Sequence, residues 1–320
     1  MKIAILGGTG FVGQYLVSEL LNQSDSPGVL IRNAPANRYR DDEKITWYAG
    51  SLDDTNSLKA MLEGKDAVIY NIGILRAYPS RGITFESLQY KGVVKTAELA
   101  QEMGVKRFIL MSANGVDLKL TPYQRTKAAA EDYIKHSDLD WTIFRPSVIF
   151  GNPHGRTEFA SMLKRDIIDP PFPAPLFFEG INPQHAGNFQ LSPVHVEDVA
   201  KAFVQALHLP ETISKTYTLG GPEDLSWREI LKLIAQVNGK SKIMLPVPTI
   251  APSMAAMILD RYSWFPISRD QISMLTKGNT CRGDDIFNLC GIKPKSFSLD
   301  NLQYLLDKHT KGEDKTASAY

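Results

Sequence analysis

The stretch KIAILGGTGFVGQYLVSELL, residues 2–21, decides the fold of this 320-residue chain. Lys2–Leu6 has the short, mostly apolar pattern of a buried strand, and the apolar side chains of residues 12–21 recur at helical spacing. Between them, Gly7, Gly10 and Gly13 form a GxxGxxG turn. A strand that passes through such a turn into a helix predicts a loop for dinucleotide phosphates, because the helix N-terminus offers unpaired N–H groups and a partial positive charge.

Each glycine of this turn has its own expected role. Gly7 permits the tight bend, Gly10 lets the backbone approach a pyrophosphate, and Gly13 lets the helix pack close to the strand. An ordinary glycine-rich turn between a strand and a helix is the alternative. The expected cofactor contacts here are Gly7, Thr9, Gly10, Phe11, Val12 and Gly13, with the Thr9 hydroxyl as an added donor.

The first half of the chain alternates predicted strands and helices. Strands are expected at residues 2–6, 29–31, 45–49, 67–72, 106–111 and 141–144, and helices follow the glycine turn and occupy 55–62, 85–103 and 123–135. This alternation predicts a doubly wound parallel sheet with helices on both faces, an α/β fold of the Rossmann type. Residues 1–150 are therefore expected to form a dinucleotide-binding domain.

Residues 151–310 are expected to form a smaller C-terminal α/β lobe, which interleaves with the first domain around 190–220. The prolines of residues 169–175 exclude a regular helix, so we expect a long functional loop or small cap at 152–187. Further on, we expect a strand and helix at 191–207, a strand at 216–219, and a helix at 227–237. Ser226 and Glu229 have the spacing of a capping box for that last helix. The polar tail 311–320 is expected to be disordered.

The second predicted strand indicates which dinucleotide binds. A site specific for NAD usually carries an acidic residue about 20 positions beyond the loop, to bind the ribose 2′-hydroxyl. This chain has Arg32 there, 19 positions after Gly13, and Arg38 and Arg40 follow. An arginine suits a 2′-phosphate, so the sequence favours NADP(H), with NAD(H) as second choice. A solvated surface arginine is the alternative.

Two further turns are expected to border the cofactor groove at the carboxyl ends of the strands. Ser51 and Leu52 follow the third strand and would flank the adenine. Asn71 and Gly73 follow the fourth and would run beside the adenosine ribose and the pyrophosphate. Each pair is also compatible with ordinary turn chemistry.

Tyr123 and Lys127 stand at positions i and i+4 of a predicted helix and share one of its faces. A phenol beside an ammonium group has its anion stabilised, so we expect the pKa of Tyr123 to fall. Such a tyrosine can exchange a proton with a substrate oxygen while hydride moves to or from a nicotinamide. The lysine can also bind the nicotinamide ribose.

With these residues in place, the chain resembles the extended and atypical short-chain dehydrogenase/reductases. The branch it resembles most includes the nucleotide-binding accessory subunit of respiratory complex I. That resemblance implies NAD(P)(H) binding, often of NADPH, and for several members a structural or assembly role in quinone-linked respiration or quinone biosynthesis. It rests on residues 7–13 (GGTGFVG), 104–109 (GVKRFI), Tyr123 with Lys127, 145–151 (RPSVIFG), 193–200 (PVHVEDVA) and 218–222 (TLGGP).

The resemblance also implies a Ser/Thr–Tyr–Lys set and a place for Pro146. Ser112 is the residue that matches the hydroxyl position, and the segment from Pro146 onward would lie beside the nicotinamide. Tyr123 follows Ser112 by only 11 residues, a shorter connection than sugar-nucleotide epimerases usually have, which argues against that activity. Tyr123 and Lys127 as a cofactor-binding pair without turnover is the alternative.

Charge and composition exclude several classes of protein. The net charge of +1 and the absence of a basic run argue against nucleic acid as a partner. Cys281 and Cys290 lack CxxC partners, and the histidines lack metal-binding spacing, so no metal is expected. His195 is expected to be packed and Asp198 to cap a helix. No targeting segment is expected before the first strand, and the expected location is cytoplasmic, at most peripheral to the inner face of a membrane.

Residues 245–275 combine prolines, methionines and aromatic residues into a candidate surface for a protein or membrane partner. A helix of the smaller lobe packed on its own substrate loop is the alternative. Two functions remain open for the whole chain. One is an accessory, assembly or redox-sensing protein linked to complex I or quinone metabolism. The other is an active NADP-dependent oxidoreductase that reduces an unassigned carbonyl substrate with Tyr123 as proton donor.

Overall fold

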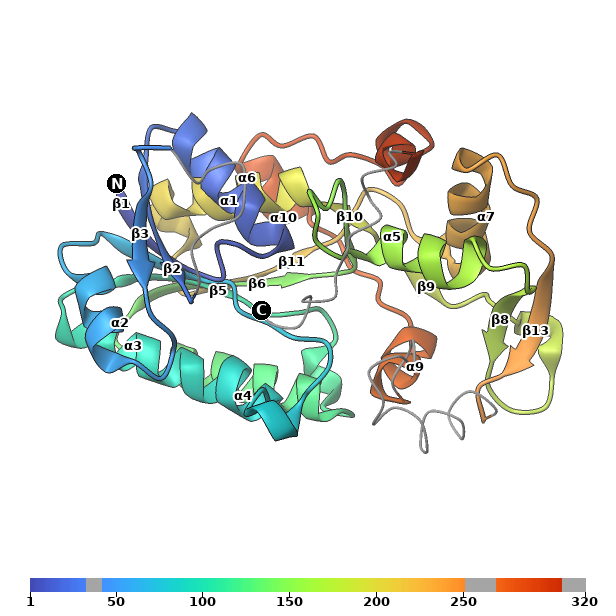
Figure 1. Ribbon diagram of the computed structural model, residues 1–320, viewed down its shortest axis with the longest axis horizontal. Helices are drawn as coiled ribbons and strands as arrows, with labels where there is room; N and C mark the ends of the chain where they lie inside the picture. Colours follow the sequence, from blue (N-terminus) through green and yellow to red (C-terminus); the bar gives the residue numbers. More distant parts are fainter. Residues whose placement is uncertain (33–41, 251–268, 307–320) are drawn as a thin grey trace.

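A central parallel sheet organises the computed structural model, which describes residues 1–32, 42–250 and 269–306 (Figure 1). The seven strands lie in the order β11-β6-β5-β4-β1-β2-β3. The chain builds one edge first, then crosses over from β3 to β4 on the other side of β1, so the strand order reverses between β1 and β4. The strands are β1 (Lys2–Leu6), β2 (Ser26–Ile31), β3 (Thr46–Ala49), β4 (Ala67–Tyr70), β5 (Arg107–Met111), β6 (Asp140–Pro146) and β11 (Lys215–Leu219).

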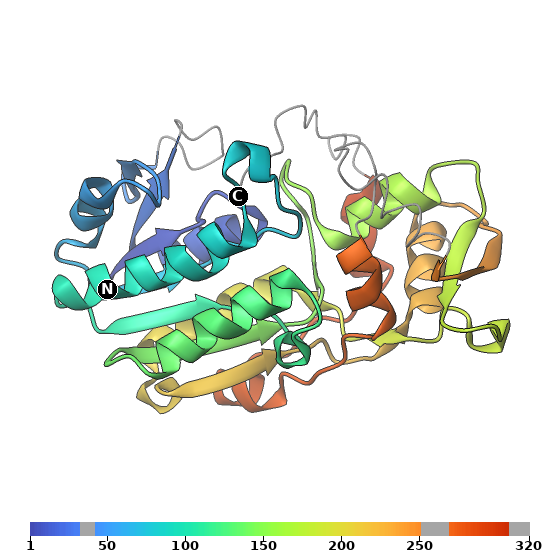
Figure 2. The ribbon, with the colours of Figure 1, turned by 90° about the horizontal axis from the view of Figure 1, so that it is seen from below.

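Helices cover both faces of this sheet, as the alternation predicted. One face carries α1 (Phe11–Asn22), α6 (Val196–His208) and α10 (Asp284–Leu289). The other carries α2 (Thr55–Leu62), α3 (Gly92–Glu102) and α4 (Pro122–Lys135), and Figure 2 shows α3 and α4 side by side in front of the strands. Each face has its own apolar cluster, and the residues of β1 alternate between the two. The predicted doubly wound fold is confirmed.

Several predicted boundaries agree with the structure. Helices α2 and α7 (Trp227–Val237) have the predicted bounds, and Ser226 and Glu229 form the predicted capping box. The helix expected at 85–103 begins instead as the π-helical turn η2 (Glu86–Lys91), which continues into α3.

The C-terminal lobe contains more regular structure than the sequence predicted. The expected loop at 152–187 holds the helix α5 (Phe159–Leu163), a second π-helical turn η4 (Lys164–Ile168) and the strand β8 (Ala174–Phe178). Strand β8 pairs in parallel with β13 (Met244–Pro248). The prolines fit this two-stranded ribbon because an edge strand can leave backbone positions without a ladder hydrogen bond.

The rest of the lobe packs around Trp227, which is 1% exposed at the start of α7. Two short ladders join the lobe to the sheet: β7 (Ile149–Phe150) with β10 (Val194–His195), and β9 (Gln190–Leu191) with β12 (Leu225–Ser226). The helix α9 (Arg269–Thr276) and the 3₁₀ helix η7 (Asp300–Leu306) complete its described elements.

The cap of α6 corrects one prediction. His195, not Asp198, is the N-cap, and its Nδ1 accepts a hydrogen bond from the Glu197 N–H. Asp198 is buried and accepts from the backbone N–H of Lys295 at 2.7 Å, so it anchors the C-terminal segment. His195 is packed, as expected, in an edge-to-face contact with Phe150, and burial lowers its pKa to about 4.

Some expectations fall on residues that are not described. Arg38, Arg40, most of the 245–275 candidate surface and the 311–320 tail lie outside the described residues. Among the described helices, none combines the length and apolar character needed to cross a bilayer.

Candidate functional site

The glycine turn lies at the point where the strand order reverses, and its geometry explains two of its glycines. Gly7 has φ +89°, a conformation that side chains with a Cβ rarely adopt. A Cβ on Gly13 would lie 2.1 Å from the Gly7 carbonyl oxygen, so only glycine lets α1 begin this close to β1. The bend predicted at Gly7 and the close helix approach predicted at Gly13 are therefore present, and their contact with a cofactor stays a prediction. Gly8 is also confined, though less than Gly13, because its Cβ would lie 2.7 Å from a side-chain carbon of Val29.

The first turn of α1 has the open backbone that a phosphate site requires. Gly10 is the N-cap and supplies no side-chain hydrogen bond, so no side chain competes for the first N–H groups of Phe11 and Val12. A Cβ on Gly10 would meet only the Gly7 oxygen, at 3.4 Å. Thr9 is half-buried beside this turn. The turn can therefore receive an anion by its backbone alone.

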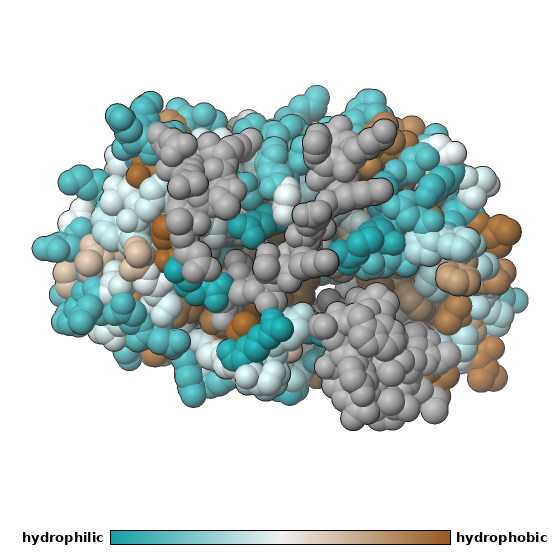
Figure 3. All heavy atoms as spheres, viewed as in Figure 1, coloured by the Kyte–Doolittle hydropathy of each residue, from teal (hydrophilic) through white to brown (hydrophobic). Residues whose placement is uncertain are grey.

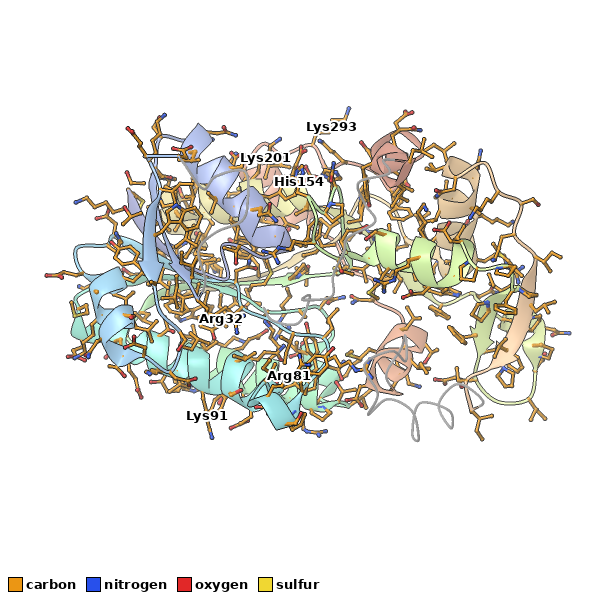
Figure 4. All side chains as sticks on the ribbon, in the orientation of Figure 1. Arg32, Arg81, Lys91, His154, Lys201 and Lys293 are labelled. Atoms are coloured by element: carbon orange, nitrogen blue, oxygen red, sulfur yellow. The ribbon has the colours of Figure 1, made fainter. Side chains whose placement is uncertain are left out.

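The other predicted groove residues border the same edge of the sheet. Arg32 follows β2 and is exposed (Figure 4). The turn that contains Ser51 and Leu52 follows β3, and Lys95 of α3 holds it by donating to the Leu52 carbonyl at 2.8 Å. Asn71 follows β4 and packs directly on the glycine turn, where its Nδ2 donates to the Gly7 oxygen at 3.4 Å.

Lys127 reaches this edge from α4. Its Nζ donates to the Met111 carbonyl at the end of β5, 2.5 Å away, and the side chain is buried. A Cβ on Gly73 would lie 3.5 Å from the same Nζ, so the turn after β4 passes directly over the lysine. Burial lowers the pKa of Lys127 to about 8, and the carboxylate of Glu131 opposes that shift. Gly73 and Lys127, distant in sequence, thus meet at one point.

Tyr123 differs from the prediction in its electrostatics. The side chain is half-buried and packs edge-to-face on Phe85, with ring centroids 5.9 Å apart. Burial raises the pKa of Tyr123 to about 12, whereas the sequence analysis expected a fall. The reason is burial, which disfavours the charged phenolate, while the ammonium group of Lys127 donates to the Met111 carbonyl. The predicted activation of the phenol is wrong for this state of the molecule.

Ser112 also differs from its predicted role. It follows β5 and is 3% exposed, and its hydroxyl donates to Oε1 of Glu131 at 2.5 Å. A hydroxyl that donates its only proton to a carboxylate cannot at the same time donate to a substrate carbonyl oxygen. In this structure Ser112 therefore connects β5 to α4, and it is not set to hold a substrate.

Glu131 is the site residue that the sequence analysis missed. Besides Ser112, it accepts hydrogen bonds from Arg145 Nε and Nη2 at 2.8 and 2.6 Å and from Lys135 at 3.2 Å. These donors hold the pKa of Glu131 below its usual range against the opposing effect of burial. The available signal was its position, one helical turn beyond Lys127 on the same face.

Pro146 ends β6 beside this cluster and is buried. Its carbonyl accepts a hydrogen bond from the Asn114 N–H at 2.9 Å, so β6 and the segment after β5 end together. The Asn114 side chain continues to Asn279 with a 2.6 Å hydrogen bond, which links the sheet to the C-terminal lobe. Among the described residues, no three acidic, histidine or cysteine side chains are grouped so that they could hold an ion.

Comparison with known proteins decides the family. A model of the NAD(P)H-binding family matches residues 7–166, from the glycine turn through α5 into the turn that follows it. The chain belongs to the NAD(P)H-binding family. This NAD(P)H-binding protein thus has a nicotinamide dinucleotide as its cofactor class, and the matched residues include the turn described above.

Curated relatives of this NAD(P)H-binding protein include a subunit of a respiratory enzyme and a reductase. The 40 kDa subunit of mitochondrial NADH-ubiquinone oxidoreductase from Neurospora crassa is 27% identical over 84% of this chain and 68% of its own length. The ceramide reductase of Caulobacter vibrioides is 25% identical over 82% of this chain and 78% of its own. Among solved structures, UDP-glucose 4-epimerase from Thermus thermophilus superposes with a TM-score of 0.72 over 98% of this chain and all of that one. At 19% identity, that last likeness shows the fold alone.

Proposed function

We propose that this protein holds a nicotinamide dinucleotide as an accessory or assembly protein, linked to respiratory complex I or quinone metabolism. The name of the Neurospora relative supports this link. The glycine turn supplies the binding element by backbone geometry alone, so the nucleotide can serve as a structural ligand or as a sensor of the redox state.

The observation that carries the proposal is the hydrogen bond from Ser112 to Glu131. It occupies the hydroxyl that a carbonyl reductase would aim at its substrate, while burial raises rather than lowers the pKa of Tyr123. Lys127, in contrast, lies where β4 and β5 end and can still bind a ribose hydroxyl. Binding without turnover fits this arrangement better than catalysis does.

We propose NADP(H) as the preferred dinucleotide, with NAD(H) second. Arg32 at the end of β2 supports this preference, because its guanidinium can form charge-assisted hydrogen bonds with a 2′-phosphate. No acidic side chain ends that strand, so nothing there selects for a free 2′-hydroxyl.

A second candidate function is reduction of a carbonyl substrate, with Tyr123 as proton donor. Two observations favour it: Tyr123 and Lys127 share one face of α4, and one relative is named as a ceramide reductase. A rotation of Lys127 from the Met111 carbonyl toward a bound ribose would bring its charge nearer the phenol and lower the pKa of Tyr123.

The partner in the accessory role would be a protein or a membrane surface. The first described residues of the 245–275 segment support this, since the side chains of Leu245 and Ile250 are 50% and 67% exposed. Apolar surface gathers over the end of the lobe that carries β8 and β13 (Figure 3). We propose a location peripheral to a membrane on the same ground.

The test is the ligand that co-purifies with the full chain, identified by mass spectrometry. Retained NADPH that no carbonyl compound oxidises is the expected result. Tyr123→Phe then separates the two candidates: unchanged NADPH affinity together with lost turnover would establish the reductase. If neither dinucleotide binds to the purified chain, both candidates fail.

A further inference from the structure

We propose that Glu131 is a positioning residue for the dinucleotide site: it fixes α4 against the end of β5 and holds the ammonium charge of Lys127. The inference rests on the proposed function, because it requires Lys127 to contact the bound nucleotide. It adds a residue that lies outside the glycine turn and outside the Ser–Tyr–Lys set.

Helix α4 meets the end of β5 through two hydrogen bonds at consecutive residues of the strand end. Lys127 donates to the carbonyl of Met111, and one helical turn later Glu131 accepts from the hydroxyl of Ser112. Two contacts spaced one turn apart fix both the axial position and the rotation of the helix. Without Glu131, Lys127 would be the one remaining hydrogen bond of this pair between α4 and the end of β5.

Both carboxylate oxygens of Glu131 have hydrogen-bond donors. The residue is 1% exposed, and its two oxygens accept hydrogen bonds from Ser112, Arg145 and Lys135. Arg145 in turn forms two hydrogen bonds with Asp117, at 2.6 and 3.0 Å. A buried carboxylate is costly unless it is paired, and this one is paired on both oxygens. Helix α4 therefore carries a fixed negative charge within one turn of Lys127.

Several charged or titratable side chains lie on α4 and on the elements packed against it near Lys127. On its own helix these are Tyr123, Glu131 and Lys135. The packed elements add Arg145 from β6 and Asp117 from the 3₁₀ turn η3 (Val116–Leu118), and Asp117 is paired with Arg145. From η2, Gln89 is buried and uncharged, whereas Glu86 and Lys91 are exposed.

Among these groups, Glu131 is the one whose charge favours the protonated lysine. Burial lowers the pKa of Lys127 to about 8, and the charge of Glu131 raises it. Without the carboxylate the lysine would lose its proton at lower pH. A neutral amine binds an anionic dinucleotide more weakly than an ammonium group, so Glu131 sets the upper pH limit of tight binding.

The experiment measures the dissociation constant of NADPH between pH 6.5 and 9.5, at constant ionic strength, by nicotinamide fluorescence on the full chain. We expect wild-type affinity to fall with a midpoint near pH 8, and Lys127→Met to abolish that step. Glu131→Gln keeps the size of the side chain and removes its charge, and should move the midpoint down by about one unit. Glu131→Asp restores the charge and should return the midpoint toward the wild-type value.

Glu102→Gln is the matched control, because Glu102 lies on the neighbouring helix α3, is half exposed and pairs only with the exposed Lys59. It should leave the midpoint unchanged. Lys135→Ala keeps Glu131 and removes a partly exposed cation, so it should fold even if Glu131→Gln does not. It should raise the midpoint, since the carboxylate then loses a competing positive charge, and a fall would overturn the inference.

The measurements distinguish a failure of the proposed function from a failure of the inference about Glu131. If wild type binds neither NADPH nor NADH at any pH, the proposed function fails. If wild type binds and Lys127→Met abolishes the step, but Glu131→Gln titrates like wild type, the inference about Glu131 fails alone. A step that persists in Lys127→Met would also overturn it, because the titrating group would then be another residue.

Discussion

The glycine turn and the charged cluster on α4 approach the same edge of the sheet and are built in opposite ways. The turn is formed by backbone. A Cβ on Gly13 would lie 2.1 Å from the Gly7 oxygen, so no residue with a side chain fits there. The cluster is formed by side chains. Glu131 accepts hydrogen bonds from Ser112 and Arg145, and Lys127 donates to a backbone carbonyl beside them. The difference teaches that the backbone of the turn does not depend on the side-chain contacts of the cluster, because neither relies on the contacts of the other.

Breaking the turn should have the largest effect. Gly13→Ala forces a Cβ into the Gly7 oxygen, so we expect it to lower the free energy of unfolding by about 3 kcal/mol and to abolish NADPH binding. Gly10→Ala is the informative partner, since Gly10 has φ −73° and room for a methyl group. It should fold normally and lose affinity only. Urea unfolding and NADPH titration of both variants check this, and equal stability losses would contradict the distinction.

Arg32→Ala should weaken NADPH binding by about tenfold and leave NADH binding nearly unchanged, because only NADPH carries the 2′-phosphate. Fluorescence titration with both dinucleotides gives the ratio directly. Lys2→Ala, at the start of β1 and far from the strand ends, is a suitable control for loss of a surface charge. An equal loss for both dinucleotides would remove Arg32 from the 2′-phosphate site.

Lys127→Met sharpens the comparison by separating stability from binding. The folded-state pKa of Lys127 is about 8, below its unfolded value of 10.5, so between these values the unfolded chain binds more protons and wild-type stability rises with pH. At pH 7 Lys127 is charged in both the folded and the unfolded chain, so burying that charge lowers the free energy of unfolding by its full amount. We therefore expect Lys127→Met to raise the free energy of unfolding of the nucleotide-free chain by about 1–2 kcal/mol at pH 7. This figure allows for the lost hydrogen bond to the Met111 carbonyl. Urea unfolding at pH 7, 8, 9 and 10 should show the advantage shrinking, and a constant advantage would argue against the titration.

Tyr123→Phe should have the smallest effect on the isolated chain. The hydroxyl is protonated near neutral pH, since burial raises the pKa of Tyr123 to about 12, and the ring contact with Phe85 survives the substitution. We expect NADPH affinity within twofold of wild type. Isothermal titration checks this, and a large loss of affinity would place the hydroxyl on the nucleotide.

Much of the fold could be predicted from sequence because its signals are local. The strand β1, the glycine turn and the caps of α2 and α7 depend on residues within a few positions of one another. The lobe was harder. Its β8–β13 ribbon pairs residues some 70 positions apart, and the prolines around β8 resemble a loop until a partner strand is present.

The sequence by itself determined the strand, the glycine turn and the start of the helix that follows, because a glycine turn between a strand and a helix specifies its own backbone; that a dinucleotide binds there stays its prediction. Only the tertiary structure decided what surrounds Lys127. The packing of α4 on β5 and β6 brings Ser112 and Arg145 to Glu131, removes that serine from a substrate-binding role, and turns the lysine toward Met111. The physical reason is that pKa and hydrogen-bond partners depend on burial and on charges brought together from separate elements, which no local spacing encodes.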